Sequence, residues 1–178
     1  GPHAVSNFLI ASLIAEAAGV APATIVGAAS SLEPAANRGR VKRLADEILL
    51  IDDTYNANPK AMRAALETLA LAHGRRRVAC LADMLELGPD GPALHREVGA
   101  ALAGRADLLL TAGPLAREIA AGSESLPPEA RISFDDAAAL ATAVPRHLRA
   151  RDAILVKGSR GMRMERVVDA IVAAFPGA

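Results

Sequence analysis

Short apolar runs recur along the chain from residue 48 onward, and each is followed by a stretch with helical spacing. Runs of this kind, apolar at every position, are typical of strands buried on both faces of a parallel sheet. The predicted strands are 48–51, 78–81, 108–110, a weaker one at 131–133, and 153–156; the predicted helices lie near 59–73, 92–103, 114–121, 135–144 and 161–174. The sequence therefore predicts a doubly wound α/β domain with a mainly parallel sheet.

The first forty residues follow a different pattern, which predicts two helices and no strand. One helix runs from His3 to Ala18, where Gly19 supplies the expected stop, and a second runs from Pro22 to Leu32. The stretch 33–40 has no periodicity and contains Pro, Asn and Gly. We therefore predict a helical unit over residues 1–40 and the α/β domain over residues 41–178.

Charge and composition exclude several classes of protein. The 20 basic and 20 acidic side chains cancel, so the chain lacks the basic surface of a nucleic-acid-binding protein. No apolar stretch is long enough for a membrane span. Cys80 is the single cysteine and lies inside an apolar run, so we expect a core residue in a reducing compartment, the cytoplasm.

Polar residues follow the predicted strands where a parallel sheet binds its ligands. They form the segments Asp52–Pro59, Asp83–Gly88, Thr111–Gly113 and Lys157–Gly161. Asn58 before Pro59 is also the ordinary start of a helix. The last segment is either a plain turn or an anion site built from Lys157, Arg160 and backbone N–H groups. The histidines lack the spacing of metal ligands, and the chain contains neither a phosphate-binding loop nor a dinucleotide fingerprint.

At these strand ends the sequence resembles the Mur ligases of peptidoglycan synthesis. The resemblance is carried, in the family's order, by the segments 1–7, 38–40, 50–59 (LIDDTYNANP), 82–88 (ADMLELG) and 156–165 (VKGSRGMRME). The family usually has Gly-Asp-Met where this chain has Ala82-Asp83-Met84. The branch that these segments match adds D-alanyl-D-alanine to a UDP-N-acetylmuramoyl-tripeptide.

The resemblance implies that the chain is the C-terminal portion of a three-domain ligase. Residues 1–40 would be the last helices of the central ATPase domain, and residues 41–178 the C-terminal Rossmann-like domain. The family uses ATP and magnesium to convert a substrate carboxylate into an acyl phosphate, from which the amine of the dipeptide displaces phosphate. Because the phosphate-binding loop would lie in the missing part, we expect this chain alone to be inactive.

The resemblance also implies individual roles. Asn7 would meet the adenine, Arg40 would lie near the nucleotide, and Asp53 would hold the ribose hydroxyls. The remaining predicted site residues would line the nucleotide and dipeptide side of the cleft: Tyr55, Asn56, Lys157, Ser159 and Arg160. We further predict that the Lys157–Gly161 turn binds the carboxylate of the incoming dipeptide.

Two other functions fit parts of the pattern. A receiver-like phospho-acceptor domain would use Asp52 and Asp53, Asp83, Thr111 and Lys157, but it would place a further strand and helix before the phosphorylated aspartate. A non-catalytic interaction module would result if the polar strand ends were only caps and turns.

Overall fold

The computed structural model describes residues 2–29 and 37–177. The chain divides into two compact units, residues 1–35 and residues 36–178. The prediction that the first unit belongs to a central ATPase domain stays a prediction.

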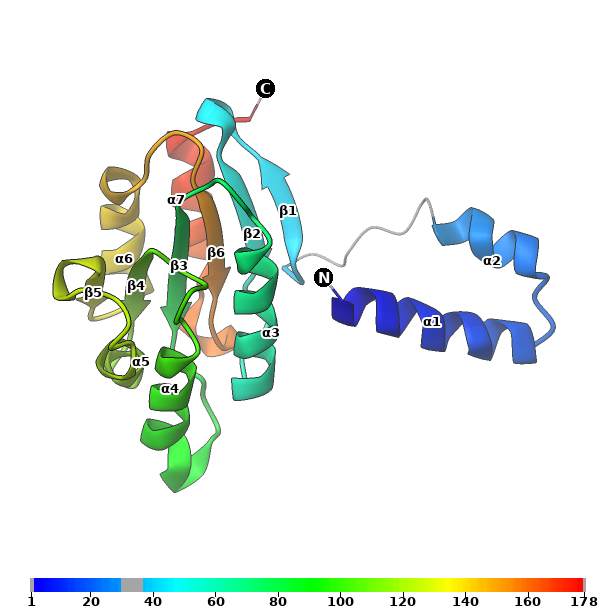
Figure 1. The fold of residues 1–178 in the computed structure, drawn as a ribbon, viewed down its shortest axis with the longest axis horizontal. Coiled ribbons are helices and arrows are strands. Elements are labelled where there is room, and N and C mark those ends of the chain that lie inside the picture. Colours follow the sequence, from blue (N-terminus) through cyan, green and yellow to red (C-terminus); the bar gives the residue numbers. More distant parts are fainter. Residues whose placement is uncertain (1, 30–36, 178) are drawn as a thin grey trace. The chain divides into compact units, whose positions relative to one another are not determined.

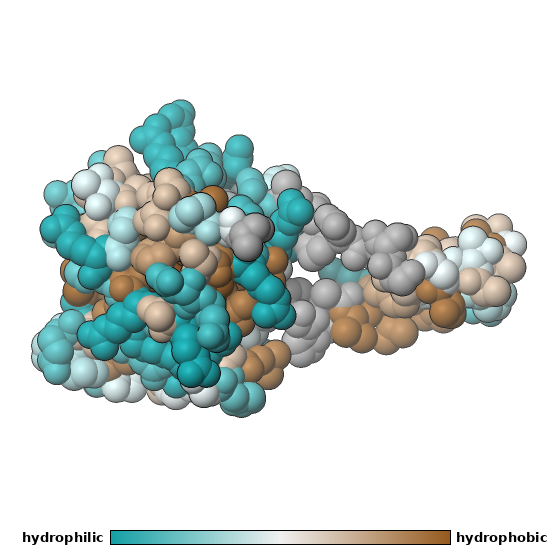
Figure 2. All heavy atoms as spheres, turned by 90° about the horizontal axis from the view of Figure 1, so that it is seen from above, coloured by the Kyte–Doolittle hydropathy of each residue, from teal (hydrophilic) through white to brown (hydrophobic). Residues whose placement is uncertain are grey.

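The smaller unit contains α1 (Pro2–Ala17) and α2 (Pro22–Ala29). Gly19 lies between them with a φ of +88°, a left-handed conformation that suits glycine after a helix end. The expected end of the second helix at Leu32 falls outside the described residues. Large apolar side chains of α1 are exposed, among them Leu9 and Leu13, and Figure 2 shows hydrophobic atoms (brown) on the surface of this unit.

The larger unit is built on a six-stranded sheet with the order β1-β2-β6-β3-β4-β5 (Figure 1). Its strands are β1 (Arg40–Arg43), β2 (Leu49–Asp53), β3 (Arg77–Ala82), β4 (Leu108–Ala112), β5 (Arg131–Phe134) and β6 (Ala153–Lys157). All pairs among β2 to β6 are parallel, which confirms the predicted sheet. The prediction omitted β1, a charged, mostly exposed edge strand that runs antiparallel to β2. Charged, short edge strands lack the apolar pattern of buried ones.

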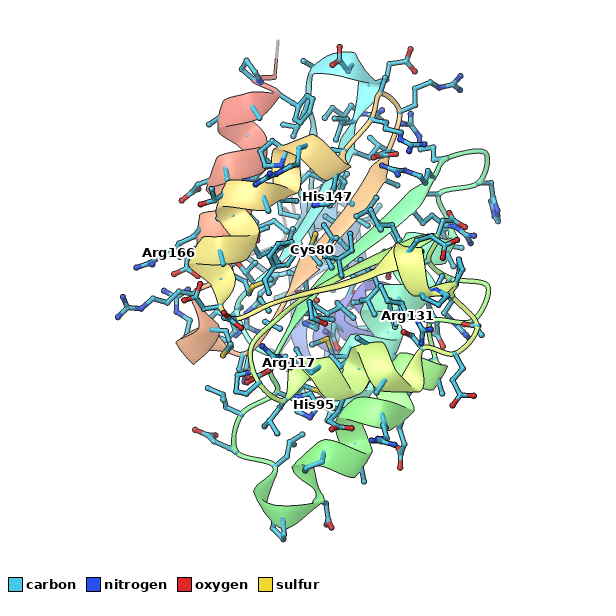
Figure 3. All side chains as sticks on the ribbon, turned by 90° about the vertical axis from the view of Figure 1, so that its left-hand side faces the viewer. Cys80, His95, Arg117, Arg131, His147 and Arg166 are labelled. Carbon is cyan, nitrogen blue, oxygen red and sulfur yellow. The ribbon has the colours of Figure 1, made fainter. Side chains whose placement is uncertain are left out.

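Helices cover both faces of the sheet, as predicted. One apolar cluster joins the sheet to α3 (Pro59–Ala70), α4 (Gly91–Ala100) and α5 (Ala116–Gly122). A second cluster joins the opposite face to α6 (Ala137–Ala143) and α7 (Glu165–Ala174). Cys80 belongs to the second cluster (Figure 3), where complete burial raises the pKa of its thiol to about 12. Its prediction as a core residue is confirmed.

The last helix begins later than expected. Residues Arg160–Met162 form a 3-10 turn, and Arg163 adopts the left-handed conformation (φ 53°, ψ 44°). An α-helix cannot continue through a left-handed residue, so α7 starts at Glu165 and not at residue 161. The Lys157–Gly161 turn therefore does not lead directly into an α-helix.

The strand order excludes the receiver-like alternative. Receiver sheets of the 2-1-3-4-5 kind keep the last strand at an edge. Here the last strand, β6, pairs with both β2 and β3. The structure also has no helix, among its described residues, that is long and apolar enough to cross a membrane.

Candidate functional site

The insertion of β6 between β2 and β3 marks the candidate ligand site of the sheet. The chain leaves β2 toward α3 on one face of the sheet and leaves β6 toward α7 on the other. Doubly wound sheets bind their ligands beyond the carboxyl ends of strands whose connections diverge in this way. Asp53 and Lys157 are paired in register at this point.

A buried ion pair joins the two strand ends. The Lys157 ammonium donates to Asp53 Oδ2 at 2.6 Å and to the carbonyl oxygen of Asn56 at 2.9 Å, with the Asp53 carbonyl at 3.4 Å. An ammonium has three protons to donate, and each has an acceptor here. The Lys157 side chain is only 3% exposed, while Asp53 keeps 24% exposure. Lys157 thus fixes both the carboxylate and the loop that follows β2.

The neighbouring acid, Asp52, has different partners. Its Oδ1 accepts from the Thr54 hydroxyl at 2.9 Å, and its Oδ2 lies 3.4 Å from Lys42 of β1. Consecutive strand residues point to opposite faces, so the two acids do not share one site. Asp52 links β2 to the edge strand, and Asp53 faces β6.

The loop between β2 and α3 contains three more residues of the predicted segment. Asn58 accepts from Ala61 N at 2.8 Å, which confirms its role as the helix cap, and Asn56 Oδ1 accepts from the next backbone N–H. Tyr55 is half exposed, and the Arg38 guanidinium lies over its ring, 4.0 Å from the ring centroid. Its own N–H donates to the Asn37 carbonyl oxygen, so Tyr55 fastens the segment before β1 to this loop.

The turn after β6 is joined to the loop after β3 by two hydrogen bonds of opposite direction. Ser159 N donates to the Asp83 carbonyl oxygen at 3.0 Å, and Leu85 N donates to Ser159 Oγ at 2.8 Å. Ser159 is buried, whereas Arg160 beside it is exposed, with its nearest carboxylate, Glu165, 3.9 Å away. Arg160 is therefore the exposed cation of this turn.

Asp83 and His95 are buried residues to which the sequence analysis gave no role in the ligase, although Asp83 was placed at the polar edge of the sheet. Asp83 Oδ1 accepts from Ala116 N at 2.6 Å, at the start of α5. Burial raises the pKa of Asp83 above its ordinary value of 3.8, against the opposing effect of the backbone N–H groups of Leu115 and Ala116. Asp83 belongs to segment 82–88, one of the segments in which the sequence resembles the Mur ligases, and this resemblance could have pointed to Asp83 as a site residue. His95 gave no signal beyond its residue type.

The structure brings part of the predicted site together. Asp53, Asn56 and Lys157 are in direct contact, and Tyr55 lies on the same loop. Arg40 lies at the start of β1, opposite Asp52 in register. Asn7 is an exposed residue of α1, in the other unit. No cluster of three or more His, Cys, Asp or Glu side chains able to hold a metal ion occurs among the described residues.

This arrangement of strands and strand ends is that of a known ligase domain. Residues 37–160 match the family described as Mur ligase, glutamate ligase domain. The chain therefore belongs to the Mur ligase family, and its larger unit has the fold of the C-terminal domain of these enzymes.

Within the family, two similar curated proteins have the same name. The UDP-N-acetylmuramoyl-tripeptide--D-alanyl-D-alanine ligase of Synechocystis is 34% identical over 99% of this chain, and that of Escherichia coli is 35% identical over 96%. The chain spans 38% and 37% of the length of these two relatives.

Solved structures agree with this result. A MurF crystal structure from Acinetobacter baumannii is 31% identical and covers 97% of this chain and 38% of its own, with a TM-score of 0.82. The MurF ligase of Thermotoga maritima, in complex with ADP, is 29% identical, with a TM-score of 0.68 over 81% of this chain and 32% of its own.

Proposed function

We propose that this chain is the C-terminal part of an ATP-dependent ligase that adds D-alanyl-D-alanine to UDP-N-acetylmuramoyl-tripeptide. The observation that carries the proposal is the match to curated ligases of that name over nearly all of the chain. The polar sheet edge supports it, because the matched segments supply the residues gathered there. The relatives named above give no support to a non-catalytic interaction module.

ATP would supply the chemistry, by phosphorylating the tripeptide carboxylate so that the dipeptide amine can displace phosphate. We propose that the rest of the ligase holds most of the ATP and the magnesium ion. This chain would then bind and orient the nucleoside and the dipeptide, and positioning of this kind accounts for much of the catalysis of phosphoryl and acyl transfer. A cytoplasmic location fits the single buried thiol of Cys80.

For the nucleotide, we propose that Asp53 accepts the ribose hydroxyls through the carboxylate oxygen that Lys157 does not use. Partial exposure of Asp53 supports this role, since the group is fixed by its ion pair and still reachable from solvent. The other proposed nucleotide contacts are those of the resemblance: Asn7, Arg40, Tyr55 and Asn56.

For the dipeptide, we propose that Arg160 binds the carboxylate, with the Ser159 hydroxyl beside it. The exposed guanidinium supports this assignment, because a charged hydrogen bond to a carboxylate needs an accessible donor. For Lys157 we propose an indirect role in place of the direct dipeptide contact that the sequence predicted, because all three protons of its ammonium already have acceptors. Lys157 would act on this part of the cleft by holding Asp53 and the Asn56 carbonyl.

The test is kinetic and uses the full-length ligase that contains this chain. ADP formation should require both UDP-N-acetylmuramoyl-tripeptide and D-alanyl-D-alanine. Loss of a charged hydrogen bond, about 1.5–3 kcal/mol, should raise the KM for ATP roughly 10- to 150-fold in Asp53→Ala. Arg160→Ala should instead raise the KM for the dipeptide.

Two results would contradict the proposal. One is ADP formation that does not depend on the dipeptide. The other is ATP turnover by the 178-residue chain alone, because this chain is proposed to lack the groups that hold the phosphates.

A further inference from the structure

We propose that His95 is a positioning residue of the ligase, which holds the Ser159–Arg160 turn in place through the loop between β3 and α4. The inference rests on the proposed function of that turn in binding the dipeptide. His95 touches neither the predicted nucleotide contacts nor Arg160, so its effect would pass through the backbone.

The first step is the way in which the imidazole is held. His95 is completely buried on α4, and Figure 3 shows its place near α5. Its Nε2 lies 2.9 Å from Met84 N, and its Nδ1 lies 2.6 Å from the Gly91 carbonyl oxygen. A backbone N–H can only donate and a carbonyl can only accept. The ring is therefore the neutral tautomer with its proton on Nδ1, and Nε2 is the acceptor for Met84.

The second step leads from Met84 to the turn after β6. The next residue, Leu85, donates its N–H to Ser159 Oγ, while Ser159 N donates to the carbonyl oxygen of Asp83. The side chain of Leu85 also covers the turn, since a Cβ placed on Gly161 would lie 2.8 Å from Leu85 Cδ1. His95 thus fixes the residue between the two that bind Ser159.

The third step is that the loop is fixed at its beginning. The Asp83 carboxylate accepts from Ala116 N at 2.6 Å, and the carboxylate packs where a Cβ on Gly113 would stand. Beyond Asp83, the bond from Met84 to His95 is the side-chain anchor of the loop before Leu85. Loss of that anchor would leave a buried N–H without its acceptor and free the loop to shift.

The consequence concerns the dipeptide and not the nucleotide. Ser159 and Arg160 follow β6, whereas Asp53 is the last residue of β2 and is held separately by Lys157. Displacement of the β3–α4 loop should therefore weaken dipeptide binding and leave ATP binding nearly unchanged. A residue needed only for overall stability would not separate the two KM values.

Two conservative variants separate the two hydrogen bonds of His95. The amide oxygen of His95→Gln reaches the place of Nε2 and keeps an acceptor for Met84 N. The amide of His95→Asn reaches only the place of Nδ1, so it keeps the donor to Gly91 and loses the acceptor. Both variants place an amide in the same buried position, and His73→Asn, at an exposed histidine, serves as the matched control.

Two measurements test the inference. In the 178-residue chain, hydrogen exchange of the Met84 and Leu85 amides should be about tenfold faster in His95→Asn and close to wild type in His95→Gln. In the full-length ligase, His95→Asn should raise the KM for D-alanyl-D-alanine about tenfold, with the KM for ATP within about twofold of wild type. His95→Gln and His73→Asn should keep both KM values.

Unchanged amide exchange in His95→Asn would overturn the inference whatever the ligase does. So would faster exchange together with an unchanged dipeptide KM, or equal rises in both KM values. A wild-type ligase without D-alanyl-D-alanine-dependent activity would instead overturn the proposed function, and the exchange data would then report the anchoring of the loop alone.

Discussion

Replacement of Lys157 by Met should destabilise the larger unit far more than removal of an ordinary surface ion pair. The substitution keeps most of the aliphatic side chain and removes the ammonium. It leaves the Asp53 carboxylate without its partner at 2.6 Å and the Asn56 carbonyl without its donor at 2.9 Å. Because the Lys157 side chain is 3% exposed, little water can replace the lost donors.

The expected loss follows from the burial of the pair. Removal of one partner from a fully buried ion pair costs about 3–5 kcal/mol. Asp53 is 24% exposed, so water recovers part of this energy. We expect a fall of about 2–4 kcal/mol in the free energy of unfolding.

A matched control is available in the same domain. Arg117 pairs with Asp135 at the same distance of 2.6 Å, but the two side chains are 59% and 86% exposed. Arg117→Met should therefore cost less than about 1 kcal/mol. Addition of Asp53→Asn to Lys157→Met removes the unpaired charge and should restore about half of the loss or more.

Urea unfolding at neutral pH, followed by far-ultraviolet circular dichroism, measures these differences, since the chain has no Trp and a single Tyr. Equal losses for Lys157→Met and Arg117→Met would show that the buried pair adds no stability. A double variant no more stable than Lys157→Met would show that the loss comes from packing and not from the unpaired carboxylate.

Two further predictions concern the loops beside this pair. Burial raises the pKa of Asp83, so the folded state binds this proton more tightly than the unfolded state; the resulting stabilisation is present below the ordinary pKa of 3.8 and is lost as pH rises through the raised value. In urea unfolding from about pH 4 to pH 7, the free energy of unfolding of wild type relative to Asp83→Asn should therefore fall with rising pH. If the two proteins instead showed the same dependence of this free energy on pH, the raised pKa of Asp83 would not contribute to stability. Gly158→Ala should lose about 1–3 kcal/mol in the same assay, because its Cβ would lie 2.7 Å from Ala82 Cβ and 2.9 Å from Met164 Cγ. Ala82→Gly in the same chain should restore part of the loss, and no rescue would assign the clash to Met164.

The parallel sheet was predictable because strands that are buried on both faces consist of continuous apolar runs, which can be recognised in the sequence. The runs around Leu50, Cys80, Leu109 and Leu155 are apolar on both faces, and both faces are covered. Strand β1 gives no such signal, since three of its four residues are exposed and it is held by pairing with β2. The start of α7 was also missed, because the left-handed conformation of Arg163 is set by the surrounding turn and not by the residue type.

The chemical types of the site were predictable, but their partners were not. The sequence indicates that Asp53 and Lys157 both follow strands, and it gives no strand order. Without that order, an ammonium after the last strand is interpreted as a free cation for an anionic ligand. The structure places Lys157 against an acid 104 positions away, and this changes it from a proposed ligand contact into the residue that fixes one.

One topological feature accounts for both groups of contacts at the sheet edge. Because β6 is inserted between β2 and β3, its last residue pairs with Asp53 on one side and with Leu81 on the other. Lys157 then holds the loop after β2, while Ser159, two residues later, holds the loop after β3. In the proposed function the loop after β2 serves the nucleotide, and the Ser159–Arg160 turn, which is bonded to the loop after β3, serves the dipeptide. A displacement of the end of β6 would therefore disturb both substrates, whereas a change at His95 reaches only the dipeptide side, and the two sets of variants can tell these routes apart.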